Sequence, residues 1–353
     1  MTQTQNIKDA LGLLEKLIAI PSFSGKEDEA ATFLASTLEM FFPSCVTRSD
    51  NHVVVDIQGE TRGSTLLLCS HIDTVEVQSN WTKAPFTPTY EGDRLYGLGA
   101  NDAGASVVSM IAATRLLKKL KKGRLLMAFV AQEEAGIEGF CKLEPSLPRY
   151  DGAIFGEPTD LKAASSMRGA MRAVMRSRGK GCHASTPWEG HNAIDQFAAD
   201  LKKLRAIDCK DSSSWGGATI EPTQIHGGKS FNQIPDLVET TLDIRTTPAK
   251  NNAWVEKTLK QTGLDITLEA DQRYPMESDE NTKIMQAYRA VCAEQDLCVF
   301  NGSCDMAFST APSIILGPGS LKVAHIADEY TNISAIEKAI PLYHALIKQF
   351  LKG

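Results

Sequence analysis

The sequence of 353 residues lacks the features that mark several large classes of protein. It has no basic surplus, because 37 Lys and Arg stand against 43 Asp and Glu for a formal net charge of −6. Nucleic-acid binders usually carry such a surplus, so we expect no nucleic-acid partner. No apolar run approaches the roughly 18 residues of a transmembrane helix, so we expect no membrane partner.

The sequence also lacks signs of export. Its first twenty residues contain no basic leader, no long apolar stretch and no small-residue cleavage site, which predicts no secretory signal. The eight cysteines include no C-x-x-C pair, so we expect free thiols in a cytoplasmic protein rather than a cysteine-based zinc site. A hydrophobic fraction of 42% with 23% charged residues indicates a globular chain, and its length suggests about two domains.

Several catalytic and nucleotide-binding motifs are absent or incomplete. Residues 97–102 begin like G-x-G-x-x-G but end in Asp, whose carboxylate would repel a pyrophosphate. Residues 228–230 (GKS) resemble the end of a P-loop, but Thr223 stands where the upstream Gly is required. The absence of G-x-S-x-G argues against an α/β-hydrolase serine site, and the absence of H-E-x-x-H excludes that helix-borne zinc site.

The first half of the chain alternates β-rich runs with helical patterns. Apolar spacing predicts helices over 7–18 and 103–120, the second ending in the lysine cluster at 118–122, where cations suit the helix dipole. Strands are predicted at 53–57, 66–70, 124–131 and 153–155. Strands that alternate with helices indicate βαβ units and a mostly parallel sheet.

The pattern changes near residue 165. The order of predicted elements becomes βαββαβ, which is that of a ferredoxin-like unit, over 171–178, 192–204, 218–226, 237–245, 252–262 and 265–269. A helix at 280–295, a strand at 313–316 and a helix at 334–351 then restore the α/β pattern. We therefore predict an α/β catalytic domain over 1–165 and 276–353, interrupted by an α+β domain at 166–275.

Residues able to bind metal follow the predicted strands. Each has an ordinary explanation alone: a solvated histidine, a helix cap, loop glutamates or a turn. Because the carboxyl ends of parallel strands meet at one edge, three of these four groups are expected together there. The groups are His71 with Asp73, Asp102 before a helix, Glu133 with Glu134, and Glu157.

The chemistry of this set indicates a metal site. Imidazole and carboxylate are good ligands for zinc or a similar divalent ion. Asp73, two residues after His71, suggests an imidazole oriented by a carboxylate. Of two adjacent glutamates, one can bind metal while the other stays free as a base.

These motifs resemble the dinuclear zinc amidohydrolase and peptidase family of acetylornithine deacetylase, succinyl-diaminopimelate desuccinylase, aminoacylase and carboxypeptidase G. The resemblance runs nearly end to end, and the GEPT and late HIADEY segments are most similar to the acetylornithine deacetylase branch. One departure follows Asp102: residues 103–105 read AGA, whereas many family members carry a basic residue soon after this Asp. The departure concerns none of the implied metal ligands. The segments that carry the resemblance are 70–75 (SHIDTV), 96–102 (YGLGAND), 133–134 (EE), 156–159 (GEPT) and 324–330 (AHIADEY).

The resemblance implies a phosphorylase/hydrolase-like catalytic domain with a mostly parallel mixed sheet, and an inserted ferredoxin-like lid and dimerisation domain. It also implies two divalent metal ions, Zn²⁺ with Co²⁺ as a substitute. Asp102 would bridge them. His71 and Glu157 would complete one site, and Glu134 and His325 the other.

The same resemblance implies roles for five further residues. Glu133 would be the general base and acid, and Asp73 would orient His71. His183 in the lid would stabilise the oxyanion, from the partner subunit in related enzymes, and Asn232 and Arg245 would bind the substrate carboxylate. Three alternatives stay open: a surface-loop histidine for His183, a structural ion pair for Arg245, and a turn-forming role for Asn232.

The implied activity is hydrolysis of a small Nα-acyl amino acid by a cytoplasmic homodimer, with N-acetyl-L-ornithine favoured and a role in arginine biosynthesis. N-succinyl-diaminopimelate, N-acetyl-citrulline, N-acetyl-lysine and small peptides are the alternative substrates. An acidic acyl group would need an extra cation, which one of Arg168, Arg172, Arg176 and Arg178 would supply. Outside the enzyme class, a non-catalytic scaffold on the same fold is the competing hypothesis.

Overall fold

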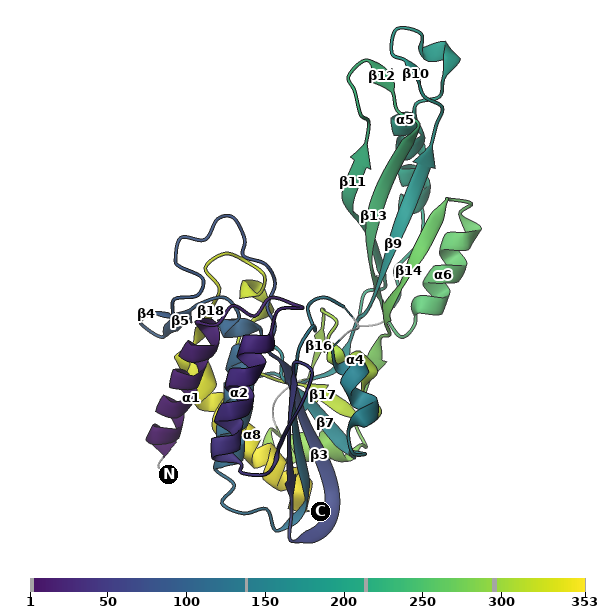
Figure 1. Ribbon diagram of the computed structural model, residues 1–353. Coiled ribbons are helices and arrows are strands. Elements are labelled where there is room, and N and C mark those ends of the chain that lie inside the picture. The colour runs from purple at the N-terminus through teal and green to yellow at the C-terminus, as the bar shows by residue number, and fades with distance from the viewer. Residues whose placement is uncertain (1–2, 137–138, 213–214, 294–296, 353) are drawn as a thin grey trace. The chain divides into compact units, whose positions relative to one another are not determined.

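The structure is a computed structural model that describes residues 3–136, 139–212, 215–293 and 297–352 (Figure 1). The chain forms two compact units. The first consists of Met1–Ser166, Ser278–Phe300 and Cys304–Gly353, and the second of Met167–Glu277 and Asn301–Ser303.

The first unit contains a mixed sheet with a parallel centre. Its strands are β1 (Val46–Ser49), β2 (His52–Gln58), β3 (Thr61–His71), β6 (Lys122–Val130), β7 (Gly152–Phe155), β8 (Ala164–Met167), β16 (Cys298–Phe300) and β17 (Ser313–Ile315). They lie in the order β1-β2-β6-β3-β7-β17-β8, with β16 also paired to β8. β6, β3, β7 and β17 are parallel, whereas β1, β2 and β8 pair antiparallel with their neighbours.

Helices cover this sheet. They are α1 (Gln3–Ile18), α2 (Asp28–Phe41), α3 (Ala105–Arg115), α4 (Phe140–Leu143), α7 (Lys283–Val291) and α8 (Ile333–Lys352). Leu66 and Leu68 of β3 pack in one cluster with residues of α1, α3 and α8. Cys69 is equally buried and pairs with Phe155, whose ring contacts Phe140 of α4 with centroids 5.3 Å apart.

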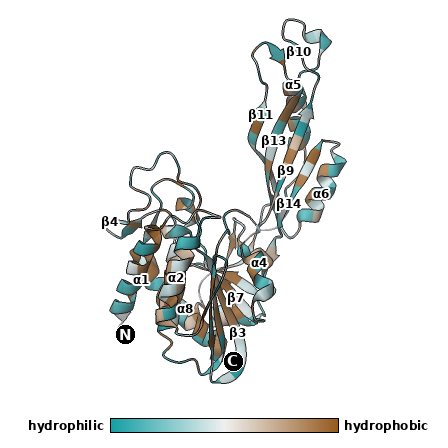
Figure 2. Ribbon diagram, viewed as in Figure 1, coloured by the Kyte–Doolittle hydropathy of each residue, from teal (hydrophilic) through white to brown (hydrophobic). Residues whose placement is uncertain are grey.

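The central strands are therefore apolar on both faces, as Figure 2 shows by the brown of β3 and β7. Fully burying one leucine side chain contributes about 1.5–3 kcal/mol, so the consecutive leucines of β3 fix this strand firmly. A smaller antiparallel sheet in the same unit joins β4 (Thr89–Glu91), β5 (Arg94–Tyr96) and β18 (Tyr330–Asn332) in the order β18-β5-β4. It ties the chain before Asp102 to the chain after His325.

The second unit has the ferredoxin-like order. Its elements are β9 (Gly169–Arg178), β10 (Cys182–His183), α5 (Ala193–Arg205), β11 (Thr219–Gly227), β12 (Gln233–Ile234), β13 (Leu237–Thr246), α6 (Asn252–Gln261), β14 (Ile266–Arg273) and β15 (Met276–Glu277). β11, β13, β9 and β14 form an antiparallel sheet in that order, and β10 pairs with β12. Asn192 and Asn251 cap α5 and α6 through their side-chain oxygens.

The predicted fold class is confirmed: a mixed α/β sheet with a mostly parallel centre, plus an α+β unit. The helix predicted over 103–120 ends earlier, at Arg115, so the prediction that the lysine cluster closes it was wrong. Four lysines within five positions repel one another and offer no apolar face, and the chain there turns into β6. None of the described helices is long and apolar enough to cross a bilayer.

Two further helices differ from the sequence prediction. The helix predicted over 280–295 is α7, which begins only at Lys283 because Asp279 forms a turn that accepts the Thr282 N–H. Residues 294–295 of that prediction lie outside the described residues. Helix α2 was not predicted, although Ala30, Ala31, Leu34 and Leu38 form its buried stripe at helical spacing.

Candidate metal centre

The carboxyl ends of three adjacent parallel strands supply most of the site. His71 is the last residue of β3, Glu133 and Glu134 follow β6, and Glu157 follows β7. His71, Glu133 and Glu157 are buried, with exposed fractions of 1%, 7% and 7%. The parallel register thus brings side chains up to 86 positions apart in sequence to one edge of the sheet.

Asp102 reaches the same place from a wide helical turn, η1 (Ala100–Gly104), that precedes α3. Gly99 enters this turn at φ +74°, and a Cβ there would lie 2.6 Å from the Thr74 side chain. Only glycine satisfies both conditions without displacing a neighbour. The peptide bond between Asp102 and Ala103 is cis.

Two imidazoles face the two oxygens of the Asp102 carboxylate. The His71 Nε2 atom lies 3.1 Å from Oδ1, and the His325 Nε2 atom lies 3.3 Å from Oδ2. A second carboxylate flanks each imidazole: Glu157 Oε2 lies 4.0 Å from His71 Nε2, and Glu134 Oε1 lies 2.7 Å from His325 Nε2. Candidate ligand atoms of His71, Asp102 and Glu134 lie within 4.8 Å of one another.

The five predicted ligands therefore lie together as two half-sites that share Asp102. The grouping of His71 with Glu157 and of His325 with Glu134 follows the pairing that the resemblance implied. His325 lies in a left-handed conformation at φ 57°, and so does Gln132 at φ 62°, directly before Glu133. Such backbone conformations cost energy in residues other than glycine and concentrate at functional sites.

The carboxylates interact through their charges. Burial, and then the charge of Asp102, raises the pKa of Glu134 to about 7 despite its hydrogen bond with His325. Burial raises the pKa of Glu157 well above its usual range, although His71 opposes this. Burial works against ionisation of Asp102 as well, but hydrogen bonds with His325 and His71 outweigh it and lower the pKa.

The histidines respond in the opposite direction. Burial disfavours protonated His71, but hydrogen bonds with Asp102 and Asp73 hold its pKa well above the ordinary value. Hydrogen bonds with Asp102 and Glu134 raise the pKa of His325 to about 11. Without metal, the cluster therefore holds protons to offset its buried negative charge.

This donor set fits divalent metal ions. It offers two imidazole nitrogens and several buried carboxylates, with one carboxylate placed between two half-sites, and nitrogen with oxygen ligands suits zinc and related ions. A bound cation would supply the positive charge that protons supply in the metal-free cluster.

Asp73 has a wider role in this geometry than orienting an imidazole. The His71 Nδ1 atom lies 2.9 Å from the carbonyl oxygen of Asp73 and 3.6 Å from its carboxylate Oδ1. The carboxylate accepts hydrogen bonds from the backbone N–H groups of Glu133 and Glu134, at 3.1 and 3.0 Å, and from the Ser24 hydroxyl at 2.6 Å. Asp73 thus fastens the end of β3 to the glutamate pair after β6.

Burial opposes ionisation of Asp73, but its hydrogen bonds from His71, Ser24 and the backbone of Glu134 outweigh this and lower its pKa. Sequence reasoning did not identify Ser24. Nothing in its local sequence indicates a contact with a residue 49 positions away.

Glu329 is the other residue that sequence reasoning missed. Its Oε1 atom accepts the N–H groups of Asn101 and Asp102, at 2.8 and 3.0 Å, and its Oε2 atom accepts that of Gly99 at 3.1 Å. The side chain is 2% exposed, and burial followed by the charge of Asp102 raises its pKa to about 8. Glu329 therefore holds the turn that presents Asp102. Its place in the HIADEY segment, four residues after His325, was the available signal.

The lid residues lie in the second unit. His183 of β10 pairs with Gln233 of β12, and the Ala184 N–H donates to the carbonyl oxygen of Asn232 at 2.9 Å. His183 and Asn232 thus lie side by side. Arg245 is one residue from the far end of β13, so the structure does not bring it to them. It makes two hydrogen bonds to Asp243, at 2.8 and 3.0 Å.

The four arginines considered for an acidic acyl group all have partners. Arg172, Arg176 and Arg178 on β9 pair with carboxylates of the same sheet unit, at 3.4, 2.9 and 2.9 Å. Arg168 donates to the backbone carbonyls of Trp215 and Gly217. The first three reinforce cross-strand contacts, and Arg168 fastens a loop.

Comparison with known proteins identifies the class. Residues 67–349 match the model of the peptidase family M20/M25/M40, and the chain belongs to this family. This confirms the resemblance drawn from the motifs and makes the protein a metal-dependent hydrolase. Its family members act as amidohydrolases and peptidases.

Named relatives extend over the whole chain. A probable succinyl-diaminopimelate desuccinylase of Staphylococcus aureus is 26% identical over 400 residues, covering 98% of each chain. An acetylornithine deacetylase of Buchnera aphidicola is 27% identical over 381 residues, covering 98% of this chain and 99% of the relative.

Solved structures share the fold. The M20 family metallo-carboxypeptidase Sso-CP2 of Sulfolobus solfataricus superposes with a TM-score of 0.79 at 19% identity, covering 98% of this chain and 99% of the other. The YXEP protein of Bacillus subtilis, described as a dinuclear metal-binding peptidase, gives a TM-score of 0.72 at 17% identity and covers 99% of each chain.

Replacing Glu329 by Gln is expected to weaken metal binding. The amide keeps one acceptor oxygen but turns an NH₂ group toward a backbone N–H, which loosens the turn carrying Asp102. Loss of such a supporting group typically costs about 10- to 100-fold in metal affinity. Competition titration with a chelator measures this, with circular dichroism to establish that the variant is folded.

The matched control is Glu337→Gln, which removes the same charge from an exposed position on α8. Equal metal affinity in the Glu329 and Glu337 variants would contradict the positioning role.

Proposed function

We propose that this enzyme hydrolyses the amide bond of a small Nα-acyl amino acid, with N-acetyl-L-ornithine as the preferred substrate. The observation that carries the proposal is the shared carboxylate of Asp102, which presents one oxygen to each of two imidazoles beside an adjacent pair of glutamates. This arrangement supports a dinuclear centre, which suits hydrolysis of an unactivated amide.

The proposed cofactor is a pair of Zn²⁺ ions, with Co²⁺ as a substitute. His71 and Glu157 would hold one ion, His325 and Glu134 the other, and Asp102 would bind both. When bound, the ions would polarise the amide carbonyl and lower the pKa of a water molecule.

Glu133 is the proposed base. It adjoins the ligand Glu134, and Asp73 fixes its backbone through the 3.1 Å bond to its N–H. Its carboxylate would accept a proton as the water oxygen forms a bond to the amide carbon. It would return that proton to the nitrogen as the C–N bond breaks, so that the amine leaves neutral.

His183 suits the proposed oxyanion role through its tautomer. Its Nδ1 atom accepts the Ser185 backbone N–H at 3.1 Å, and the Ser185 hydroxyl lies 2.7 Å away. Because a backbone N–H only donates, Nδ1 of the neutral ring carries no proton and Nε2 does. An Nε2–H group is the donor that a developing oxyanion needs.

Asn232, beside His183, and Arg245 are proposed to bind the substrate carboxylate from different subunits of the proposed homodimer, because one chain does not bring these two residues together. On substrate binding, Arg245 would release the Asp243 carboxylate and bind the substrate carboxylate in its place. The planar pair of N–H donors of its guanidinium suits either group. The ion pair with Asp243 equally suits a structural role for Arg245. A loss of activity in Arg245→Lys through KM alone would support the binding role.

The acyl group is proposed to be acetyl rather than succinyl. A second carboxylate on the substrate needs a cation, and releasing Arg172, Arg176 or Arg178 would break a contact between strands, whereas the Arg245–Asp243 pair lies within one strand. Releasing Arg168 would free the loop whose backbone carbonyls it holds. Succinyl-diaminopimelate is the second candidate, because relatives with that probable function align over the full chain.

Glu133→Ala is expected to lower kcat by about 10²- to 10⁴-fold, because the variant loses its proton carrier. Metal content should stay at two ions per chain, since no ligand is removed. Initial rates and elemental analysis measure the two quantities, with the exposed Glu337→Ala as control. A Glu133→Ala variant with full activity would refute the assigned base, and a scaffold protein would show no activity in either form.

A substrate panel tests specificity. Free-amine release should be highest with acetyl-ornithine and should stop when metal is removed by a chelator. The panel compares acetyl and succinyl forms of ornithine, citrulline, lysine and diaminopimelate, together with a dipeptide. Faster turnover of succinyl-diaminopimelate or the dipeptide would keep the hydrolytic centre and refute the acetyl assignment.

We also propose that the second unit serves as the lid and dimerisation domain of a cytoplasmic homodimer. β11 is one of the two edge strands of its sheet and has an unpaired side among the described residues, where another strand can pair. Light scattering at micromolar concentration should then give twice the chain mass of 38.4 kDa. A single-chain mass would refute the dimer without affecting the proposed reaction.

A further inference from the structure

A second cavity lies in the first unit, apart from the metal cluster. It has a volume of about 800 Å³ and is bounded chiefly by three segments, the loop after Glu157, the loop before His325 and the first turns of α8, with Asn101 and strand β18 completing the wall. That volume lies within the usual range of small-molecule sites. Among the described residues that line it, none is a predicted metal ligand or the predicted base.

The lining is positively charged. Lys162, Lys322 and Lys338 each come from a different one of the three segments, and Asp160 is the sole acidic residue among the described lining residues. The Asp160 carboxylate accepts a hydrogen bond from the Ser320 hydroxyl at 3.0 Å. The formal charge of the lining is therefore +2, in a chain whose net charge is −6.

The three ammonium groups have no partners within the part of the chain that the structure describes. Lys162, Lys322 and Lys338 make no side-chain hydrogen bond and no ion pair there. This contrasts with Lys83, Lys119 and Lys260, which pair with glutamates. Three lysines from three segments thus surround one cavity without an acidic partner.

Neutral groups that donate hydrogen bonds complete the lining. Ser334 and Lys338 are four residues apart on α8 and so share a helix face, but the Ser334 hydroxyl already donates to Asp93 Oδ2 at 2.6 Å. Asn332 and Tyr330 line the cavity from β18. Ammonium, hydroxyl and amide groups together are the set that binds phosphate and carboxylate oxygens.

We infer that this cavity is a second ligand site, and that it binds a small multivalent oxyanion through Lys162, Lys322 and Lys338. A phosphate group and a polycarboxylate share that chemistry. A nucleic-acid strand does not fit, because three lysines around one cavity give no extended basic track.

The site lies against loops that carry metal ligands. The Asn101 side chain lines the cavity and makes two hydrogen bonds with Ser320, at 3.1 and 2.8 Å. Asn101 directly precedes Asp102, and Val323 in the lining is two residues before His325. A bound anion would therefore contact the segments that position both half-sites.

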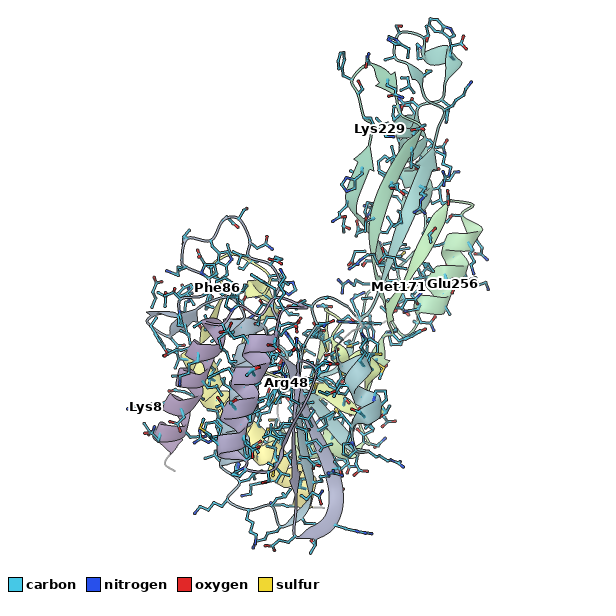
Figure 3. The ribbon with its side chains drawn as sticks, in the orientation of Figure 1. Lys8, Arg48, Phe86, Met171, Lys229 and Glu256 are labelled. Atoms are coloured by element: carbon cyan, nitrogen blue, oxygen red, sulfur yellow. The ribbon has the colours of Figure 1, made fainter. Side chains whose placement is uncertain are left out.

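Isothermal titration of the full-length, metal-loaded protein with inorganic phosphate tests the site. We expect saturable binding whose affinity falls at least tenfold in the triple variant Lys162→Gln, Lys322→Gln, Lys338→Gln. The matched control is Lys8→Gln, Lys16→Gln, Lys348→Gln, which removes the same charge from exposed lysines of the same unit. Lys8 projects outward from α1 (Figure 3).

Tricarballylate, a tricarboxylate, forms the second arm and distinguishes a carboxylate ligand from a phosphate ligand. If one of the two anions binds more strongly than the other, and its binding depends on the three lysines, the result supports the site and identifies the chemical class of its ligand. The affinity for phosphate bound at the metal centre would be the same in the lysine variant as in the wild type, which would contradict binding at the three lysines. Isotherms that are the same for the wild type and both triple variants would overturn the proposal. Because the readout is binding, it is independent of the substrate assignment.

Discussion

The burial of like charges at one edge of a parallel sheet is the constraint on which the site depends. Four acidic residues converge there: Asp102, Glu133, Glu134 and Glu157. The exposed fraction is 7% for each of Asp102, Glu133 and Glu157. Burial, and then repulsion from neighbouring carboxylates, raises the pKa of Glu134 and of Glu157. Such a cluster persists only with compensating positive charge, which protonated imidazoles provide without metal and divalent cations provide with it. The same repulsion that destabilises the empty cluster therefore favours cation binding.

Two other acidic side chains hold the cluster in place through the backbone, although they add to its negative charge. Asp73 accepts the N–H groups of the glutamate pair, and Glu329 accepts three N–H groups of the turn that carries Asp102. Each replaces water around peptide groups that burial would leave unsatisfied. The positions of the predicted ligands are thus set by buried acids outside the predicted ligand set. The cost of folding six acidic residues into one region is shared between backbone hydrogen bonds and the bound cations.

Much of this was accessible from the sequence, because parallel strands place their carboxyl ends together. The runs at 66–70, 124–131 and 153–155 predict the strands, and the residues after them predict the cluster. The pattern could not give the contacts of Ser24 and Glu329, since these depend on loops that close over 49 and 227 positions. Nor could it show that Arg245 pairs with Asp243, because alternate residues of one strand share a face with or without a substrate. The local periodicity of apolar residues predicts helices and strands. Hydrogen bonds between distant loops cannot be predicted from it, because they depend on the tertiary fold.

The lysines around the second cavity are not explained by the acidic cluster. Two opposite unit charges 4 Å apart attract each other by about 1 kcal/mol in bulk water. Dissolved salt screens such attraction between exposed charges that are more than about 10 Å apart. Lys162, Lys322 and Lys338 are exposed and touch none of the cluster carboxylates, so they stabilise it weakly. Water and salt weaken the repulsion among these exposed lysines in the same way, so the lysines are tolerated around one cavity. An anion bound between them would remove the remaining repulsion and add charge-assisted hydrogen bonds. The two sites are therefore complementary: the loops that carry Asp102 and His325 present predicted metal ligands on one side and face a basic cavity on the other.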